Sequence, residues 1–404
     1  MSRSQTLLVT QPDELKAVVS RARSAGAVAF DTEFMRERTY RARLCLVQIA
    51  FDEEIALVDA AGELDLEPVG TILGDDAVEI FVHSGRQDFE IFYDLFGVVP
   101  ARAFDVQVAA GFAGHGASLP YGRLVASVLG VQLKKGEAYT DWCRRPLTDA
   151  QMTYAADDVR FLGDVAARLR ESLSRQGRLV WAEEEMADLC DADTYRSAPG
   201  ELWRRVSGRG TLSARQTAVL REVAAWREEE AARRDLPRGW VVKDVALVEI
   251  ARRMPTTIAE LRAIRGLGRG QAERIGAGVV GAVARGKAAP GIAPADRPSR
   301  ELQARARMLS GLADAVVRAR CEREGVAAEL VATRGELEGV LMEVVSGTLE
   351  EDHHRLLAGW RRELAGDAVL DLARGRLGVR VVDHPPYVEE VTLRDHEEGA
   401  RGNQ

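Results

Sequence analysis

The chain has 404 residues, of which 46% are hydrophobic and 29% are charged, which is ordinary for a water-soluble globular protein. This length exceeds one comfortable hydrophobic core, so two or three domains are expected. The first residues lack the long apolar core of a signal peptide, and no apolar run is long enough to span a bilayer. These features argue against a membrane protein and favour a cytoplasmic one.

The formal net charge of −8 hides an uneven distribution. Residues 201–287 carry 18 Lys and Arg against 10 Asp and Glu, whereas the segments on both sides are acidic. A basic segment between two acidic ones is the asymmetry expected where a chain meets a polyanion.

The cysteines are widely scattered, with no C-x-x-C pair and no histidine at zinc spacing. We therefore expect reduced structural thiols at Cys45, Cys143, Cys190 and Cys321.

The first elements in chain order are a short strand, TLLVT, a helix over about 13–25 and a second strand, AVAFDTEF. This second strand places Asp31 and Glu33 in an otherwise apolar run. Side chains two apart in a strand point the same way, so both carboxylates would lie on one side of the sheet. Buried adjacent carboxylates need a shared proton, a basic partner or a cation, and hard divalent ions suit oxygen ligands best. A strand end facing water is the alternative for a D-x-E pattern taken alone.

A basic loop that includes Arg36 and Arg38 follows, then the strand-like runs RLCLVQIAF, EIALVDA and VEIFVHS with a helix near 66–73. Strands interleaved with helices predict an α/β sandwich with a mixed sheet. After the last run, the turn Ser84-Gly85 opens a helix with Asp88 in its first turn. There Asp88 could simply complement the helix dipole.

The irregular segment LKKGEAYTDWCRRPLT interleaves basic and aromatic residues. Such a mixture suits contact with a phosphate backbone and its unstacked bases. An ordinary loop with Trp142 plugged into the core is an equal alternative. The candidate contacts are Lys134, Lys135, Trp142, Arg144 and Arg145.

A long helix is predicted from Thr148, where T-D-A-Q has the spacing of a capping box. Within this helix, Tyr154 and Asp158 are four residues apart and so share one face.

Residues 201–287 show apolar spacing typical of an all-helical domain, in which Arg234, Arg238 and Lys243 surround Trp240 as further candidate contacts for a polyanion. A linker rich in Pro and Ala precedes a second, acidic helical domain at 297–380. Residues 381–404 are expected to form a partly disordered tail.

Three stretches, FDTEFMRERTY with RLCLVQIA, FVHSGRQDFEIF and DWCRRPLTDAQMTYAADDVRFL, resemble the three motifs of the ribonuclease D family. This family belongs to the DEDD 3′–5′ exonucleases, in the subtype with tyrosine in the last motif. Three short motifs in the right order are far more specific than any one alone. RRDLPRGWVVKDVALVEIA and ELRAIRGLGRGQ look like the first of two helicase-and-RNase-D C-terminal (HRDC) domains, and 297–380 resembles the second by position and helicity.

The resemblance implies an RNase H-like exonuclease domain at 1–197, followed by HRDC-type domains at 201–287 and 297–380. It also implies two Mg²⁺ or Mn²⁺ ions held by Asp31, Glu33, Asp88 and Asp158, with Tyr154 orienting the attacking water. The expected reaction is trimming of the 3′ ends of tRNA precursors and other small structured RNAs. The sequence leaves the oligomeric state open, with a monomer favoured. The alternatives are a DNA 3′–5′ exonuclease and a non-catalytic nucleic-acid-binding protein on a nuclease scaffold.

Overall fold

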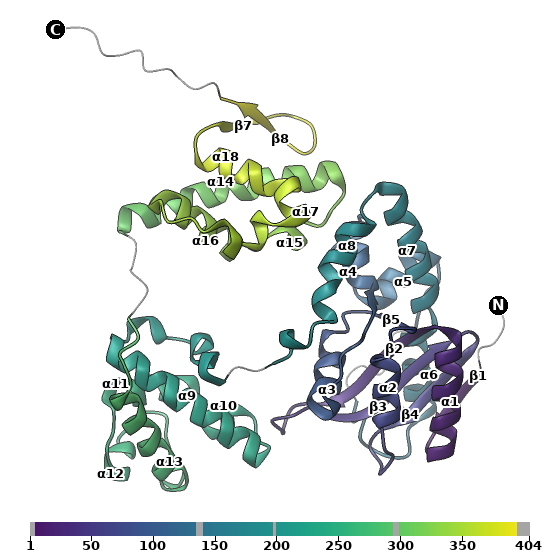
Figure 1. Cartoon of the computed structure of the whole chain (residues 1–404), viewed down its shortest axis with the longest axis horizontal. Coiled ribbons are helices and arrows are strands. Elements are labelled where there is room, and N and C mark those ends of the chain that lie inside the picture. Colours follow the sequence, from purple (N-terminus) through teal and green to yellow (C-terminus); the bar gives the residue numbers. More distant parts are fainter. Residues whose placement is uncertain (1–4, 135–139, 197–198, 294–298, 394–404) are drawn as a thin grey trace.

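The computed structural model describes residues 5–134, 140–196, 199–293 and 299–393. These form an N-terminal α/β domain (5–196), a middle helical domain (199–293) and a C-terminal domain (299–393), shown in Figure 1.

The N-terminal domain is built on a six-stranded sheet of order β1-β4-β3-β2-β5-β6. The central strands β3 and β4 are antiparallel to their neighbours β2 and β3, whereas β1, β5 and β6 pair in parallel. The predicted mixed sheet is therefore confirmed. The strands are β1 (Gln5–Val9), β2 (Ala27–Met35), β3 (Arg43–Phe51), β4 (Glu54–Asp59), β5 (Glu79–Val82) and β6 (Ala103–Asp105).

Helices cover both faces of this sheet. Phe30 of β2 points to the side of α3, where its ring packs against Phe89 and Phe92. The opposite face is covered by α6 and α7, which contact the central strands. The helices are α1 (Pro12–Ala25), α2 (Glu67–Leu73), α3 (Arg86–Phe96), α4 (Val106–Phe112), α5 (Tyr121–Leu129), α6 (Asp149–Arg160), α7 (Leu162–Gln176) and α8 (Leu179–Met186).

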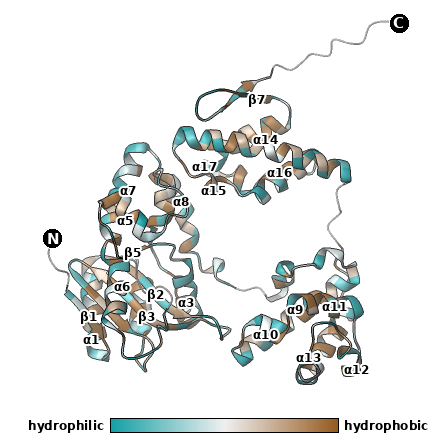
Figure 2. Ribbon diagram, turned by 180° about the vertical axis from the view of Figure 1, so that it is seen from behind, coloured by the Kyte–Doolittle hydropathy of each residue, from teal (hydrophilic) through white to brown (hydrophobic). Residues whose placement is uncertain are grey.

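The middle domain has its own hydrophobic core. Figure 2 shows its apolar residues gathered where α9, α11 and α13 face one another. The Ser213 hydroxyl accepts a hydrogen bond from Gln216 N and begins the longest helix of the domain. The helices are α9 (Ala214–Arg234), α10 (Arg238–Val241), α11 (Asp244–Arg253), α12 (Ile258–Leu261) and α13 (Arg269–Ala288).

The C-terminal domain shares one continuous core with the N-terminal domain. Trp360 packs edge-on against Phe112 of α4 at 4.8 Å and stacks on Trp181 of α8 at 5.7 Å. Beside them, the Arg361 guanidinium pairs with the Glu185 carboxylate. The elements are α14 (Arg300–Glu324), α15 (Ala328–Val331), α16 (Arg334–Ser346), α17 (Gly359–Arg361), the π-helix η7 (Arg362–Gly366), α18 (Asp367–Ala373), β7 (Leu377–Val381) and β8 (Val388–Thr392).

The segment expected to be a tail from 381 includes strand β8, so the ordered fold extends further than the sequence suggested. The β7–β8 hairpin is tied to α14 by an ion pair between Arg320 and Glu390 at 2.6 Å. Residues 394–404 lie outside the described residues.

A loop of the N-terminal domain docks on the middle domain. The Tyr40 hydroxyl donates to Glu228, and Tyr40 N donates to an Asp235 carboxylate oxygen at 3.0 Å. The Arg238 guanidinium, which pairs with Glu228, lies 5.6 Å from the centre of the Tyr40 ring. Because this loop directly follows β2, the contact joins the middle domain to the strand that carries Asp31 and Glu33.

Candidate active site

The predicted acid pair lies on β2 as expected. Asp31 pairs with Gln48 and Glu33 with Leu46 of β3, and a register shift follows directly after Glu33. Alternation places Asp31 and Glu33 on the side covered by α6, while Thr32 between them points to the side of α3. The strand therefore presents one polar side chain to α3 and two carboxylates to α6.

Asp88 reaches the same end of β2 from the first turn of α3. Asp88 is 7% exposed, and its carboxylate accepts a hydrogen bond from the Thr32 hydroxyl. The tight turn before α3 leaves no room for a side chain at Gly85, where an added Cβ would lie 2.6 Å from a Val82 methyl. This close approach explains the glycine.

Asp105 holds that turn in place. Its buried carboxylate accepts hydrogen bonds from Ser84 N at 3.0 Å and Gly85 N at 3.1 Å. It also caps α4 by accepting from Gln107 N and Val108 N. One carboxylate thus ties the start of α4 to the turn that aims Asp88.

The third motif lies on α6, which begins at the predicted capping box of Thr148 and Gln151. Asp158 lies on the face of α6 that meets β2, and the Tyr154 hydroxyl hydrogen-bonds to its carboxylate. The Tyr154 ring packs against Trp142, with the ring centres 5.9 Å apart.

The acids meet in an environment that disfavours their charge. Burial, together with repulsion from Asp88, Asp158 and Glu33, raises the pKa of Asp31 well above its usual range. Burial is also the main cause that raises the pKa of Glu33 to about 8 and those of Asp88 and Asp158 to about 7. No Lys, Arg or His forms an ion pair with any of these four acids in the part of the chain that the structure describes.

The geometry of this cluster would allow it to hold a cation. Carboxylate oxygens of Asp31, Glu33 and Asp158 all lie within 4.8 Å of one another, close enough to share an ion. Oxygen-only donors suit hard divalent ions such as Mg²⁺ and Mn²⁺. Asp88 is not one of these three, but its charge acts on Asp31, so it borders the same site.

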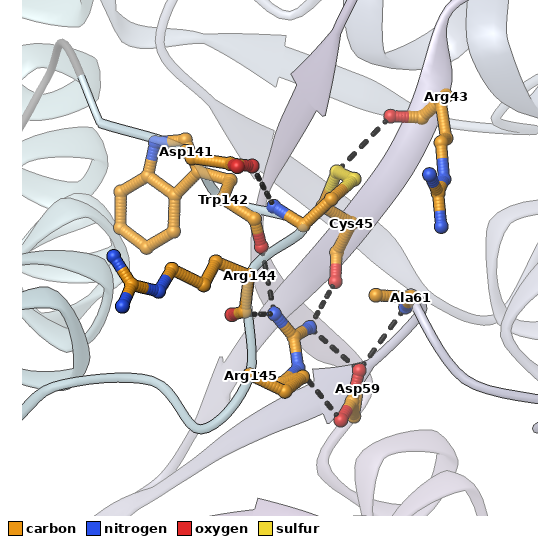
Figure 3. Close-up of polar contacts among 9 residues, drawn as sticks. Arg43, Cys45, Asp59, Ala61, Asp141, Trp142, Arg144 and Arg145 are labelled. Atoms are coloured by element: carbon orange, nitrogen blue, oxygen red, sulfur yellow. Dashed lines mark hydrogen bonds and ion pairs between the residues drawn. A yellow bond between two sulfur atoms is a disulfide. The ribbon is translucent and has the colours of Figure 1, made fainter.

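Two of the predicted RNA contacts have structural roles instead. Trp142 is 2% exposed, so its side chain is packed in the core, as the alternative interpretation of this loop predicted, and it cannot stack on a base. Arg145 forms a two-pronged ion pair with Asp59, at 2.6 and 2.9 Å, and donates to the carbonyls of Cys45 and Trp142 (Figure 3). The prediction that Trp142 stacks on RNA bases is therefore wrong, and Arg145 helps to hold the loop against the sheet.

The cysteine prediction also needs correction. Cys45 of β3 and Cys143 in this loop form a disulfide, with their Cα atoms 5.0 Å apart (Figure 3). Cys190 and Cys321 are free thiols, as expected. The disulfide and the Arg145 ion pair anchor the same loop.

The remaining predicted RNA contacts fall into two groups. Three are engaged in ion pairs: Arg36 with Glu90, Arg234 with Glu230 and Arg238 with Glu228. The others are exposed side chains at Arg38, Lys134, Arg144 and Lys243, while Lys135 lies outside the described residues.

Sequence reasoning missed Thr32 and Asp105. Thr32 had a usable signal, because it stands between two acids in a strand and must face the other side of the sheet. Asp105 had a local signal only for its cap of α4, because its other partners lie about 20 residues away in a turn whose geometry only the fold reveals.

Comparisons with known proteins agree with this architecture. Residues 7–174 match a family model described as 3′–5′ exonuclease, and residues 216–283 match the HRDC domain. Ribonuclease D of Gluconacetobacter diazotrophicus is 42% identical over 375 residues, covering 92% of this chain and 93% of that protein. Ribonuclease D of Acidiphilium cryptum is 38% identical over 393 residues, covering 94% and 98%.

A solved structure gives the same answer. Escherichia coli RNase D, described as an exoribonuclease involved in structured RNA processing, superposes with a TM-score of 0.81 at 31% identity, covering 92% of this chain and 99% of that one. Within the described residues, the helices are all too short or too polar to cross a bilayer. The chain therefore belongs to the ribonuclease D family and is a 3′–5′ exoribonuclease.

Proposed function

We propose that this enzyme trims the 3′ ends of tRNA precursors and other small structured RNAs by metal-dependent phosphodiester hydrolysis at Asp31, Glu33, Asp88, Tyr154 and Asp158. The observation that carries the proposal is the meeting of Asp31, Glu33 and Asp158 within 4.8 Å, without a basic partner. Half-buried carboxylates that repel one another are costly unless a proton, a basic group or a cation relieves their charge, and a cation relieves it without protonating the acids.

The donor set fits two divalent ions, Mg²⁺ or Mn²⁺. Asp31, Glu33 and Asp158 would hold one, and Asp88 with Asp31 would hold the other. When bound, such a pair supplies positive charge beside the attacking and leaving oxygens of the phosphodiester. The protein's part is to hold the carboxylates rigidly, through the β2 backbone, the Thr32 hydroxyl and the start of α3.

Tyr154 is assigned to orienting the attacking water rather than to removing its proton. Burial and the neighbouring carboxylates raise the pKa of its phenol, so the hydroxyl stays protonated at neutral pH. A protonated phenol donates a hydrogen bond and cannot act as a base. Trp142 behind the ring limits its rotation and keeps the hydroxyl beside Asp158.

The choice of substrate rests on two supports. The similar E. coli enzyme is described as acting in structured RNA processing, and the middle domain of this chain is strongly basic. A basic domain beside a nuclease domain suits an RNA with a folded body and a single-stranded 3′ end.

The test is a tRNA precursor with a 3′ extension, labelled at its 5′ end and incubated with Mg²⁺ or Mn²⁺. We expect a ladder of single-nucleotide steps that stops near the folded body. Asp158→Asn should abolish the ladder, whereas Asp149→Asn, an exposed acid on the same helix, should leave it unchanged. Faster trimming of a matched DNA strand would contradict the RNA assignment.

A further inference from the structure

A cavity of about 440 Å³ lies between α3 and the segment that leads to the middle domain. One wall comes from the first two turns of α3, with Arg86, Gln87 and Glu90. The other wall comes from residues 194–196 and 201–205, including Tyr195 and Arg205.

The cavity has an excess of positive charge. Its carboxylates are already neutralised, because Glu90 pairs with Arg36 at 3.2 Å and Glu201 pairs with Arg204. Arg86 and Arg205 are exposed and have no acidic partner within the described residues. Two unpaired guanidinium groups facing one cavity are a ready site for phosphate oxygens.

The wall beneath Arg86 is rigid. Tyr195 is 9% exposed and its hydroxyl donates to the Leu189 carbonyl at 2.9 Å, which fixes the ring. The Arg86 guanidinium lies 5.7 Å from the centre of this ring. An arginine that rests on a fixed aromatic face keeps its N–H groups free for a ligand and loses little entropy on binding.

The cavity lies close to the proposed catalytic acids. Arg86 and Asp88 are two residues apart on α3, so they point to opposite sides of a helix about 10–12 Å across. The Arg36–Glu90 pair continues the wall to the end of β2, just beyond Glu33. A strand bound at the acids could therefore reach the cavity within a few nucleotides.

We propose that this cavity binds the sugar–phosphate backbone of the RNA upstream of the 3′ end, with Arg86 and Arg205 as the phosphate contacts. The inference rests on the proposed active site, because the position of the catalytic acids fixes where the 3′ end of the bound RNA lies. It assigns to α3 two roles on opposite faces, metal binding through Asp88 and substrate holding through Arg86.

The test measures binding rather than cleavage, so it is independent of the chemistry. Every variant is made in an Asp31→Asn background, and its affinity for a single-stranded RNA 12-mer and for a dinucleotide is measured against salt concentration. Arg86→Ala and Arg205→Ala should each weaken 12-mer binding about tenfold and lower the slope of log K against log salt by about 0.7, the value for one phosphate contact on a single strand. Dinucleotide binding should not change.

Two controls separate this role from a structural one. Arg86→Lys keeps the charge and should keep the salt slope, even if it loses contact with Tyr195. Arg168→Ala, an exposed arginine of α7, should change neither quantity. The proposal would be overturned if Arg86→Ala and Arg205→Ala left the salt dependence of 12-mer affinity unchanged. It would also be overturned if these variants weakened dinucleotide binding as much as 12-mer binding. Failure of Asp158→Asn to stop the ladder would instead count against the active site.

Discussion

Thr32 donates its hydroxyl to the carboxylate of Asp88, and this bond joins the strand of Asp31 and Glu33 to the helix of Asp88. The Thr32 hydroxyl lies on the opposite side of the strand from Asp31 and Glu33. Its hydrogen bond therefore links these two acids of β2 to Asp88 of α3. It also lowers the pKa of Asp88, opposing the effect of burial.

Replacing Thr32 by the isosteric valine should therefore impair the site without removing an acid. We expect a 10–100-fold loss of activity, the usual effect of removing a group that orients a metal ligand. The Mg²⁺ concentration needed for half-maximal rate should rise, because Asp88 becomes harder to ionise. Steady-state trimming rates across a Mg²⁺ series would show this.

Thr217→Val is the matched control for that change. Thr217 is also buried, and its hydroxyl donates to a backbone carbonyl in the middle domain. We expect a similar small loss of stability with no change in Mg²⁺ requirement. An equal Mg²⁺ shift in both variants would refute the role given to Thr32.

Removing the Asp105 carboxylate should destabilise the fold strongly. Asp105→Ala leaves the N–H groups of Ser84 and Gly85 without their acceptor and uncaps α4. A lost cap costs about 1 kcal/mol and each buried unpaired group about 1–3 kcal/mol, so we expect about 3 kcal/mol or more. Urea unfolding compared with Thr148→Ala, a simple cap variant, should show the larger loss for Asp105→Ala.

The raised carboxyl pKa values predict how stability depends on pH. A carboxylate with a higher pKa in the folded state binds its proton more tightly there, so stability falls as pH rises through the folded value. For Glu33 the window runs from its ordinary value of 4.5 to about 8. Metal-free enzyme should therefore have a lower free energy of unfolding at pH 8 than at pH 5.

Denaturant unfolding in a chelator at several pH values would measure this. Glu33→Gln should flatten the decline, because its amide does not titrate. Mg²⁺ should stabilise the wild type more at pH 8 than at pH 5. A stability that rises across this window and is unaffected by Glu33→Gln would show that folding does not raise the pKa of the Glu33 carboxyl.

Trp360 is expected to be critical for the whole protein rather than for its C-terminal domain alone. Because it packs on Phe112 and Trp181, Trp360→Ala opens a cavity between two domains and should cost about 3–5 kcal/mol. Trp240→Ala, at a 59% exposed tryptophan of the middle domain, should cost less than about 0.5 kcal/mol. Thermal unfolding of the two variants would compare these effects.

Local sequence patterns were sufficient for the elements that carry the acids. The D-x-E run in an apolar strand, the turn before Asp88 and the capping box at Thr148 each depend on residues close in sequence, and the structure has all three. The family motifs then indicated which acids belong together, and Asp31, Glu33 and Asp158 do meet.

Long-range packing was beyond the sequence. Cys45 and Cys143 are 98 residues apart, and spacing alone could not pair them. The same applies to Arg145, whose basic charge suggested RNA but whose partner Asp59 lies 86 residues away. A charged or aromatic residue in a loop looks the same in sequence whether it faces solvent or the sheet.

The shared core around Trp360 limits where the chain can be truncated without exposing apolar surface. A fragment ending at residue 197 would keep every proposed catalytic acid yet leave Phe112 and Trp181 bare on its surface. Such an uncovered aromatic patch favours aggregation. A stable catalytic fragment must therefore retain the C-terminal domain. The middle domain has a separate core, so its removal should disturb the rest of the fold less.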